Sequence, residues 1–217
     1  MSAKGGAVID SVRRALRREA GAPVPARPEI LPARAAAEAE AEVEVDLLLK
    51  EVTALAGVAQ RVSQAEVGAS LRRLVEQEDV RRATCWNTPR LRALDIEGQL
   101  RACGVEMVPP RADKHALAQC DLGVTEADFA LPETGTLGLL SSPEKPRGVS
   151  LLPRVHLALV SRSALRADLH QVFTEAKAHP YLILISGPSR TSDIELTVTL
   201  GVHGPRALHL WVLDDRR

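Results

Sequence analysis

Apolar positions along this chain follow two alternating spacings. Segments in which apolar residues recur every three or four positions are separated by short apolar runs of strand length. In the first half, we expect helices over residues 47–55, 63–78, 88–102 and 113–119, and strands over residues 57–62, 80–86 and 104–108. Ser63 and the pair Thr88-Pro89 support two of these helix starts, because Ser and Thr cap helices and Pro suits the first helical position.

The second half continues this alternation with one interruption. Two extended segments, at residues 122–131 and 135–140, are joined through Pro132 to Gly135 and predict a unit resembling a β-hairpin. Strands are then expected at residues 155–160, 181–185 and 208–213, with a helix at 163–178. Fully apolar strands are typical of a sheet covered on both faces. The pattern therefore predicts an α/β fold with an open, mostly parallel sheet and helices on both faces.

The N-terminal part differs from the rest of the chain. Ile9, Val12 and Leu16 form a short apolar stripe flanked by arginines, and an Ala/Pro/Glu-rich stretch follows from about residue 21. We therefore divide the chain into an N-terminal helix and linker at residues 1–45 and a folded domain at residues 46–217. The stripe is too short to fold stably alone, so the arm is a candidate surface for docking on a neighbouring subunit and forming a homo-oligomer.

Composition excludes several classes of protein. With 28 basic and 28 acidic residues and 2% aromatic residues, the chain has neither the positive field nor the stacking surfaces that favour nucleic-acid binding. No apolar run is long enough for a membrane span and no secretory leader is recognisable, so we expect a soluble cytoplasmic protein. Cys85, Cys103 and Cys120 form no CxxC pair, so neither a metal site nor an iron–sulfur cluster is expected in this chain.

Residues 181–205 carry the densest set of candidate chemistry. We expect a strand, a Ser-Gly-Pro-Ser loop and a helix opening at Thr191 or Ser192, which would place the loop where ligands meet helix N-termini in open α/β sheets. The helix would be closed by Gly201 and Gly204-Pro205. In the alternative interpretation, this pattern only caps the helix. The loop lacks the Gly-Lys-Ser/Thr of a nucleotide-binding P-loop. The candidate ligand-binding residues here are Gly187, Ser189, Arg190, Thr191, Glu195 and His203, with Asp193 as a candidate catalytic carboxylate.

Two earlier stretches add candidates. The turn Glu133-Thr134-Gly135-Thr136 places a carboxylate and two hydroxyls around a glycine, which suits either a functional turn or an ordinary one. The loop at residues 141–149 contains Arg147 and precedes Ser150, so it is either a lid carrying a cation or a solvated loop. His156 lies inside an apolar strand, and we interpret it as a core residue rather than a ligand contact.

Three ordered motifs resemble one known family. ADFALPETGTLGLLS, RGVSLLPRVHLALV and ISGPSRTSDIELTVTLGVHGPRALHLWVL together resemble the LUD-domain proteins, specifically the lactate utilisation protein C family. The resemblance covers residues 127–213 most specifically. It implies a fold similar to the NagB/RpiA/CoA-transferase-like group. It also implies a role in oxidising L-lactate to pyruvate together with two companion proteins that carry iron–sulfur clusters.

The candidate residues occupy positions that match the motifs of this family. Glu133, Thr134, Gly135 and Thr136 match the family's ETGT, Arg147 and Ser150 match its R-x-x-SLLP, and residues 187–195 and 201–205 match its final motif. The resemblance does not establish whether this chain performs chemistry. From the charges of these side chains, we expect Glu133 and Asp193 to be catalytic and a small anionic ligand to be neutralised by Arg147 and His203. Two alternatives stay open. One is a stand-alone enzyme similar to CoA transferases or sugar-phosphate isomerases, with Glu133 as nucleophile or base. The other is a scaffold with a vestigial pocket.

Overall fold

The computed structural model describes residues 10–16, 40–192 and 198–214. By its internal contacts, the chain separates into residues 1–32 and residues 33–217, and the first unit contains a short helix at residues 10–15. No helix in the described ranges is both long enough and apolar enough to cross a membrane. The second unit contains the sheets and the candidate site described below.

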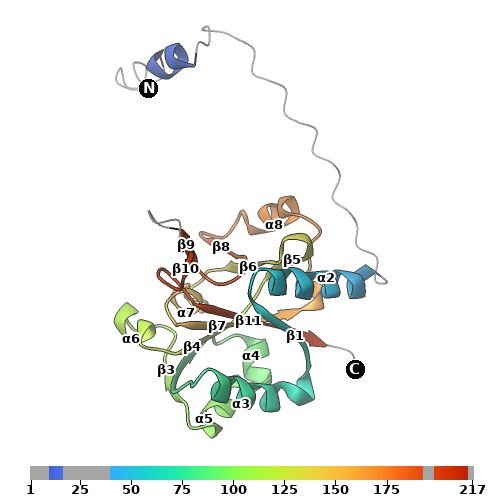
Figure 1. Ribbon diagram of the computed structural model, residues 1–217, viewed down its shortest axis with the longest axis vertical. Coiled ribbons are helices and arrows are strands. Elements are labelled where there is room, and N and C mark those ends of the chain that lie inside the picture. Colours follow the sequence, from blue (N-terminus) through green and yellow to red (C-terminus); the bar gives the residue numbers. More distant parts are fainter. Residues whose placement is uncertain (1–9, 17–39, 193–197, 215–217) are drawn as a thin grey trace. The chain divides into compact units, whose positions relative to one another are not determined.

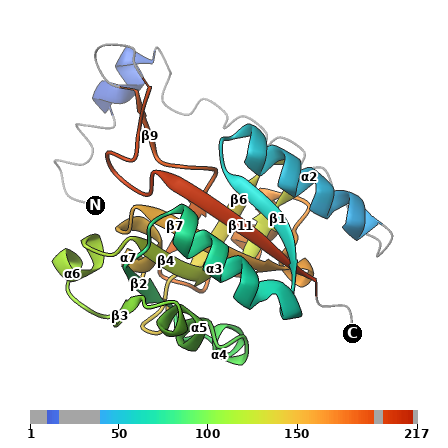
Figure 2. The same ribbon diagram turned by 60° about the horizontal axis from the view of Figure 1, so that its bottom comes forward.

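Six parallel strands form the central sheet of this unit (Figures 1 and 2). Every neighbouring pair in the sheet runs parallel. The strands, in spatial order, are β1 (Val58–Ser63), β11 (Ala207–Asp214), β7 (Val155–Ser161), β4 (Leu122–Glu126), β2 (Arg82–Cys85) and β3 (Glu106–Val108). All residues of β7 are buried, as expected for a strand covered on both faces.

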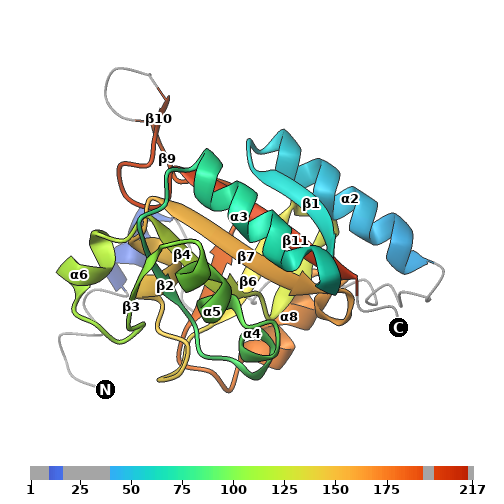
Figure 3. The same ribbon diagram turned by 90° about the horizontal axis from the view of Figure 1, so that it is seen from below.

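Helices cover both faces of the central sheet, which confirms the predicted fold class (Figures 1 and 3). One face carries α3 (Val67–Gln77), α4 (Pro89–Ala93) and α5 (Ile96–Ala102). The opposite face carries α2 (Glu40–Ala54) and α7 (Gly148–Leu151). α6 (Lys114–Ala118) precedes β4 in the chain. Thr88 caps α4 as predicted, because its side chain accepts a hydrogen bond from the amide of Leu91.

A second, antiparallel sheet lies on the α2 side of the central sheet (Figure 1). Its strands, in spatial order, are β5 (Phe129–Leu131), β6 (Thr136–Leu140) and β8 (Leu182–Ile185). β5 and β6 form the predicted hairpin, joined by the short 3-10 helix η2 (Pro132–Thr134). A small apolar cluster joins this sheet to α8 (Leu169–Ala176). It includes Phe129 of β5, Leu140 of β6 and Val172 of α8.

Three predictions in the C-terminal third differ from the structure. The segment expected to open a helix at Thr191 is strand β9 (Arg190–Ser192), which pairs antiparallel with β10 (Val198–Leu200). The predicted strand at residues 181–185 exists as β8, but it pairs antiparallel with β6 and lies outside the parallel sheet. The helix predicted at residues 163–178 is shorter, because the 3-10 helix η3 (Arg162–Ala164) and an extended Leu165 precede α8.

Candidate functional site

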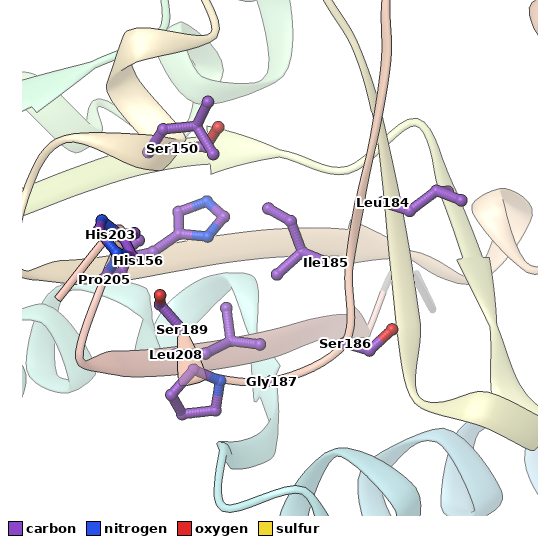
Figure 4. Close-up of a pocket in the computed structure, with 13 residues that line it drawn as sticks. Ser150, His156, Leu184, Ile185, Ser186, Gly187, Ser189, His203, Pro205 and Leu208 are labelled. Carbon is purple, nitrogen blue, oxygen red and sulfur yellow. The ribbon is translucent and has the colours of Figure 1, made fainter. Parts of the chain in front are cut away.

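A cavity of about 260 Å³ lies between the central sheet, α7 and β8. It is lined by side chains and backbone from four places in the chain: α7, the starts of β7 and β11, the end of β8 with the loop after it, and residues 203–205 (Figure 4). The lining residues are Ser150, Leu151, His156, Leu184, Ile185, Ser186, Gly187, Pro188, Ser189, His203, Gly204, Pro205 and Leu208.

The floor of the cavity is a row of residues on adjacent parallel strands. Gly123 of β4 pairs with His156 of β7, and His156 pairs with Leu208 of β11. Paired residues on neighbouring strands point to the same face of a sheet. Since His156 and Leu208 are near the first residues of their strands, the cavity lies at the amino ends of β7 and β11. The carboxyl edge expected from the sequence is the opposite edge of the sheet.

Gly123 allows α7 to lie directly on this floor. A Cβ atom at Gly123 would stand 1.9 Å from the carbonyl oxygen of Val149, a distance that real atoms do not reach. The missing side chain therefore lets the backbone of α7 approach the sheet and brings Ser150 over the cavity. Ser150 is fully buried, and its hydroxyl donates to the carbonyl oxygen of Arg147 at 3.0 Å.

His156 is held at one of its two ring nitrogens. Its Nε2 lies 2.8 Å from Oγ1 of Thr125, which stands on the same face of β4. Within the described part of the chain, its Nδ1 is buried and has no hydrogen-bond partner. Burial lowers the pKa of His156 from 6.5 to about 3, because the charged imidazolium would lose its hydration. The ring is therefore neutral at physiological pH.

The Glu133-Thr134-Gly135-Thr136 turn is connected to the loop after β8 by a hydrogen bond. The hydroxyls of Thr136 and Ser186 lie 2.7 Å apart, and the Thr134 hydroxyl donates to Oγ1 of Thr136 at 2.8 Å. Gly135 has a φ of +57°, and a Cβ there would stand 2.9 Å from the backbone of Glu51 and Val52 in α2. The turn thus requires glycine at this position and packs against α2. Of its residues, Glu133 and Thr134 are exposed.

The loop after β8 is anchored to the segment before β11. The amide of Ser189 donates to the carbonyl oxygen of Pro205 at 2.8 Å, and the amide of Gly201 donates to the carbonyl oxygen of Ser189 at 3.0 Å. These bonds bring Ser189 and His203 to the same cavity. Arg190 is directed elsewhere, because its guanidinium donates to the carbonyl oxygen of Leu55 after α2. Thr191 pairs with Thr199 in the β9–β10 hairpin.

The structure thus brings together some of the predicted site residues. Ser150, Gly187, Ser189 and His203 line one cavity. Thr136 is one hydrogen bond away, through Ser186. The cavity lining does not include Glu133, Thr134, Gly135, Arg147, Arg190 or Thr191. Asp193 and Glu195 lie outside the described residues.

Two of the excluded residues bear directly on the expected chemistry. Arg147 stacks over the ring of Tyr181, 5.0 Å from its centre, so its guanidinium is engaged with an aromatic ring. Because Glu133 is exposed, the turn does not give it the enclosed environment that a nucleophile or base of the CoA-transferase type would need. None of the described residues that line the cavity is Asp, Glu, Lys or Arg.

Sequence reasoning missed two polar side chains of this site. It treated His156 as a core residue, yet His156 lines the cavity, and it did not single out Ser186. A signal for His156 existed, since it is the one ionisable residue within the apolar run 155–160 and is the second residue of that run. No comparable signal marked Ser186, because its role depends on the contact with Thr136 from a distant part of the chain.

The donor set of the described residues does not suit a metal centre. No group of three or more His, Cys, Asp or Glu side chains in these ranges could hold a metal ion. Cys85 and Cys120 pack in separate apolar clusters, so their thiols do not converge. Burial raises the pKa of the Cys85 thiol to about 12 and that of Cys120 to about 11, which disfavours the thiolate that a metal requires.

Comparisons with known proteins identify the family. The model of the LUD domain matches residues 45–213. The chain is 36% identical over 155 residues to the protein named Lactate utilization protein C of Halalkalibacterium halodurans, an alignment that covers 66% of this chain and 67% of that protein. It is 30% identical over 167 residues to the protein of the same name from Shouchella clausii, covering 72% of this chain and 73% of the relative.

A solved structure is similar in fold. The crystal structure of a DUF162 family protein from Deinococcus radiodurans aligns with 83% of this chain and 100% of its own, with a TM-score of 0.55 and 19% sequence identity. At this identity the likeness concerns the fold alone. The family model, in contrast, matches nearly the whole of the folded unit. The chain therefore belongs to the LUD domain family.

Proposed function

We propose that this chain is the non-cluster subunit of a cytoplasmic assembly that oxidises L-lactate to pyruvate. The observation that carries the proposal is the similarity, over about two thirds of each chain, to relatives named lactate utilization protein C. These relatives support a role in lactate utilisation. The reaction, the assembly and the compartment are parts of the proposal.

The cysteine chemistry favours a division of labour between subunits. Oxidation of L-lactate to pyruvate releases two electrons and two protons, which need a redox carrier. The three thiols of this chain are free, and two of them are buried in separate clusters with raised pKa values, so they are poor cluster ligands. In the proposal, the electrons pass to iron–sulfur clusters in companion proteins, and this chain contributes the ligand site.

The ligand in this proposal is a small organic anion bound in the cavity beside α7. Ser186 and Ser189 line the cavity with hydroxyl groups, and His203, an exposed residue, also lines it, whereas the Ser150 hydroxyl already donates to the carbonyl oxygen of Arg147. At about 260 Å³, the cavity is slightly smaller than ordinary ligand pockets, roughly 300–1,000 Å³, which suits a small molecule. The catalytic roles of Glu133 and Asp193 remain hypotheses. Each can be tested by the charge-removing variants Glu133→Gln and Asp193→Asn in cells growing on L-lactate.

The proposal also includes self-association through the N-terminal arm. Val12 on the short helix at residues 10–15 and Leu16 directly after it are exposed, so they are available to another surface. Because residues 33–217 form a compact unit by themselves, deletion of residues 1–32 should leave that unit folded. Comparison of the full chain with the deletion variant by analytical ultracentrifugation will measure any contribution of the arm to self-association.

Co-purification tests the proposal as a whole. The chain, carrying an affinity tag, is expressed at native level in its own cells growing on L-lactate and is recovered under anaerobic conditions. We expect a brown complex whose other subunits contain iron–sulfur clusters and which reduces an artificial acceptor when L-lactate is added. A colourless preparation without companions, or a complex that ignores L-lactate, would contradict the proposal. Cells growing on glucose with the same tagged chain provide the control.

A further inference from the structure

The Nδ1 atom of His156 is an unusual feature of the candidate site. It is buried and has no hydrogen-bond partner among the described residues, although buried polar atoms are nearly always paired. Figure 4 shows the ring projecting from β7 between Ser150, Ile185 and Ser189, all of which line the cavity. His156 as a whole is 1% exposed and Nδ1 itself is buried, so a partner for Nδ1 would come from the cavity and not from bulk solvent.

The other nitrogen of the ring is fixed by the sheet. Nε2 lies 2.8 Å from Oγ1 of Thr125, and both residues are in the middle layer of the fold, on the adjacent parallel strands β4 and β7. A hydrogen bond at one ring nitrogen fixes the orientation of the ring and so the direction in which the other nitrogen points. Thr125 is fully buried, so water does not compete for this bond. Because the Thr125 hydroxyl can donate to or accept from Nε2, the bond forms with either tautomer, and Nδ1 is a donor in one and an acceptor in the other.

The surroundings of Nδ1 limit the charge of any ligand. The polar side chains that line the cavity are those of Ser150, Ser186, Ser189 and His203, besides His156 itself, and Ile185, Leu184 and Leu208 form apolar walls. Lys and Arg side chains are absent from the described lining. A phosphate group, with about two negative charges, would lose its hydration here with no Lys or Arg side chain to replace it. A single carboxylate, hydroxyl or oxo group would be satisfied by hydroxyls and one imidazole.

From these observations we propose that His156 contacts the ligand directly, through a hydrogen bond from or to Nδ1, and that the cavity selects a small hydroxy or oxo acid carrying at most one charge. The assignment of the ligand class rests on the proposed function, whereas the role of His156 rests on the geometry of the cavity. His156 acts here as a binding and positioning residue.

Because its ring is neutral, His156 is suited to binding a ligand by a hydrogen bond and not to transferring a proton. A general base works best when its pKa is near the operating pH, and burial lowers the pKa of His156 to about 3. The imidazole is therefore a weak base in the cavity. It remains a good hydrogen-bonding group, because a neutral imidazole always has one donor and one acceptor nitrogen.

Nuclear magnetic resonance of the histidine ring nitrogens tests the contact in the full chain. The protein is labelled with 15N in its histidine side chains, and the His156 signals are assigned by their loss in the His156→Asn variant. L-lactate, pyruvate and D-ribose 5-phosphate are then added separately at up to 50 mM. We expect L-lactate or pyruvate to shift the Nδ1 signal of His156 more than its Nε2 signal, and the sugar phosphate to leave both unchanged.

Variants separate binding from folding. His156→Asn keeps an amide near the position of Nδ1, whereas His156→Phe keeps ring size and removes both nitrogens. We expect the Asn variant to retain measurable binding of the responding acid and the Phe variant to weaken it at least tenfold, with both variants folded by circular dichroism. If His156→Phe does not fold, His156→Asn must still show altered affinity. The matched control is His170→Asn, at an exposed position on α8, which should bind like the parent chain.

The outcomes distinguish this inference from the proposed function. If neither acid moves the His156 signals, or if His156→Phe binds as well as the parent chain, the inference is wrong even where the chain is needed for lactate oxidation. If the sugar phosphate alone shifts Nδ1, the ligand class is wrong. L-lactate or pyruvate could shift the Nδ1 signal while cells that lack the chain still oxidise lactate. That pair of results would support the inference and contradict the proposed function.

Discussion

The hydroxyl groups of Thr136 and Ser186 lie 2.7 Å apart, although 50 residues separate them in the chain. Thr136 ends the turn that packs against α2, and Ser186 begins the loop that lines the cavity. This bond therefore connects a rigid turn to a binding loop. Through it, Thr136 contacts a lining residue of the cavity without lining the cavity itself.

Removal of this bond should destabilise the chain modestly. Thr136→Val keeps the shape of the side chain and removes its hydroxyl, and we expect the free energy of unfolding to fall by about 1 kcal/mol, a typical net value for one hydrogen bond. Ser186→Ala should have a similar effect. If the two hydroxyls act as a pair, the double variant will lose less than the sum of the two, as measured by urea denaturation. Strict additivity would show that the bond contributes nothing.

Gly135 should tolerate no side chain. Gly135→Ala places a Cβ 2.9 Å from the backbone of α2 in addition to the strain of its φ of +57°. The matched control is Gly104→Ala, where φ is +80° and no atom lies within 4 Å of the new Cβ. We expect the control to lose roughly 1–2 kcal/mol from strain alone. Overpacking should make Gly135→Ala lose on the order of 1–3 kcal/mol more. Equal melting temperatures for the two variants would contradict the packing of the turn on α2.

The alternating pattern predicted most helices and strands of this fold correctly. The spacing of apolar residues along a segment reflects which side of that segment is buried, and this differs between a helix and a strand. The parallel strands were recognisable because runs such as 155–160 are apolar on both faces. Periodicity says nothing, however, about which strand pairs with which. β8 has the composition of a parallel strand, yet it pairs antiparallel with β6. The expected position of the site at the carboxyl edge of the sheet failed for that reason.

The wrong helix at Thr191 has a local cause. The spacing of Ser192, Asp193 and Glu195 resembles a capping box and favoured a helix. The same stretch continues as Ile-Glu-Leu-Thr-Val-Thr-Leu at residues 194–200, in which apolar and polar residues alternate with the period of a strand. In the structure, β9 and β10 form a hairpin, so the alternation was the better guide. A capping-box pattern therefore predicts a helix only where the residues after it have apolar positions at helical spacing.

Buried His156 should make stability depend on pH. Its pKa is about 3 in the folded chain and about 6.5 in the unfolded chain, so the unfolded chain binds more protons between these values. The stabilisation is complete above pH 6.5 and is lost as the pH falls toward 3. One proton changes the free energy of unfolding by up to about 1.4 kcal/mol per pH unit. His156→Asn should flatten the slope measured between about pH 6.5 and pH 4.5, whereas His170→Asn should not. Parallel slopes for all three proteins would contradict the burial of a neutral ring.

The three thiols should react at different rates. Burial raises the pKa of Cys85 to about 12 and of Cys120 to about 11, whereas Cys103 is partly exposed. Because the thiolate is the reactive form, we expect iodoacetamide at pH 8 to modify Cys103 first and the other two only after unfolding. Mass spectrometry of the modified peptides measures the order, and Cys103→Ser is the control. Rapid modification of Cys85 in the folded chain would contradict its place in the core.

Lactate consumption by cells that lack this chain tests the central proposal most directly. Extracts of the deletion strain, of the same strain carrying the parent chain, and of the strain carrying the Thr136→Val or His170→Asn variant are supplied with L-lactate and an artificial electron acceptor. The account predicts that deletion abolishes the conversion of L-lactate to pyruvate and that the parent chain and the His170→Asn control restore it fully, with Thr136→Val restoring only part of it. Undiminished conversion in the deletion strain would contradict the proposal that this chain takes part in lactate oxidation.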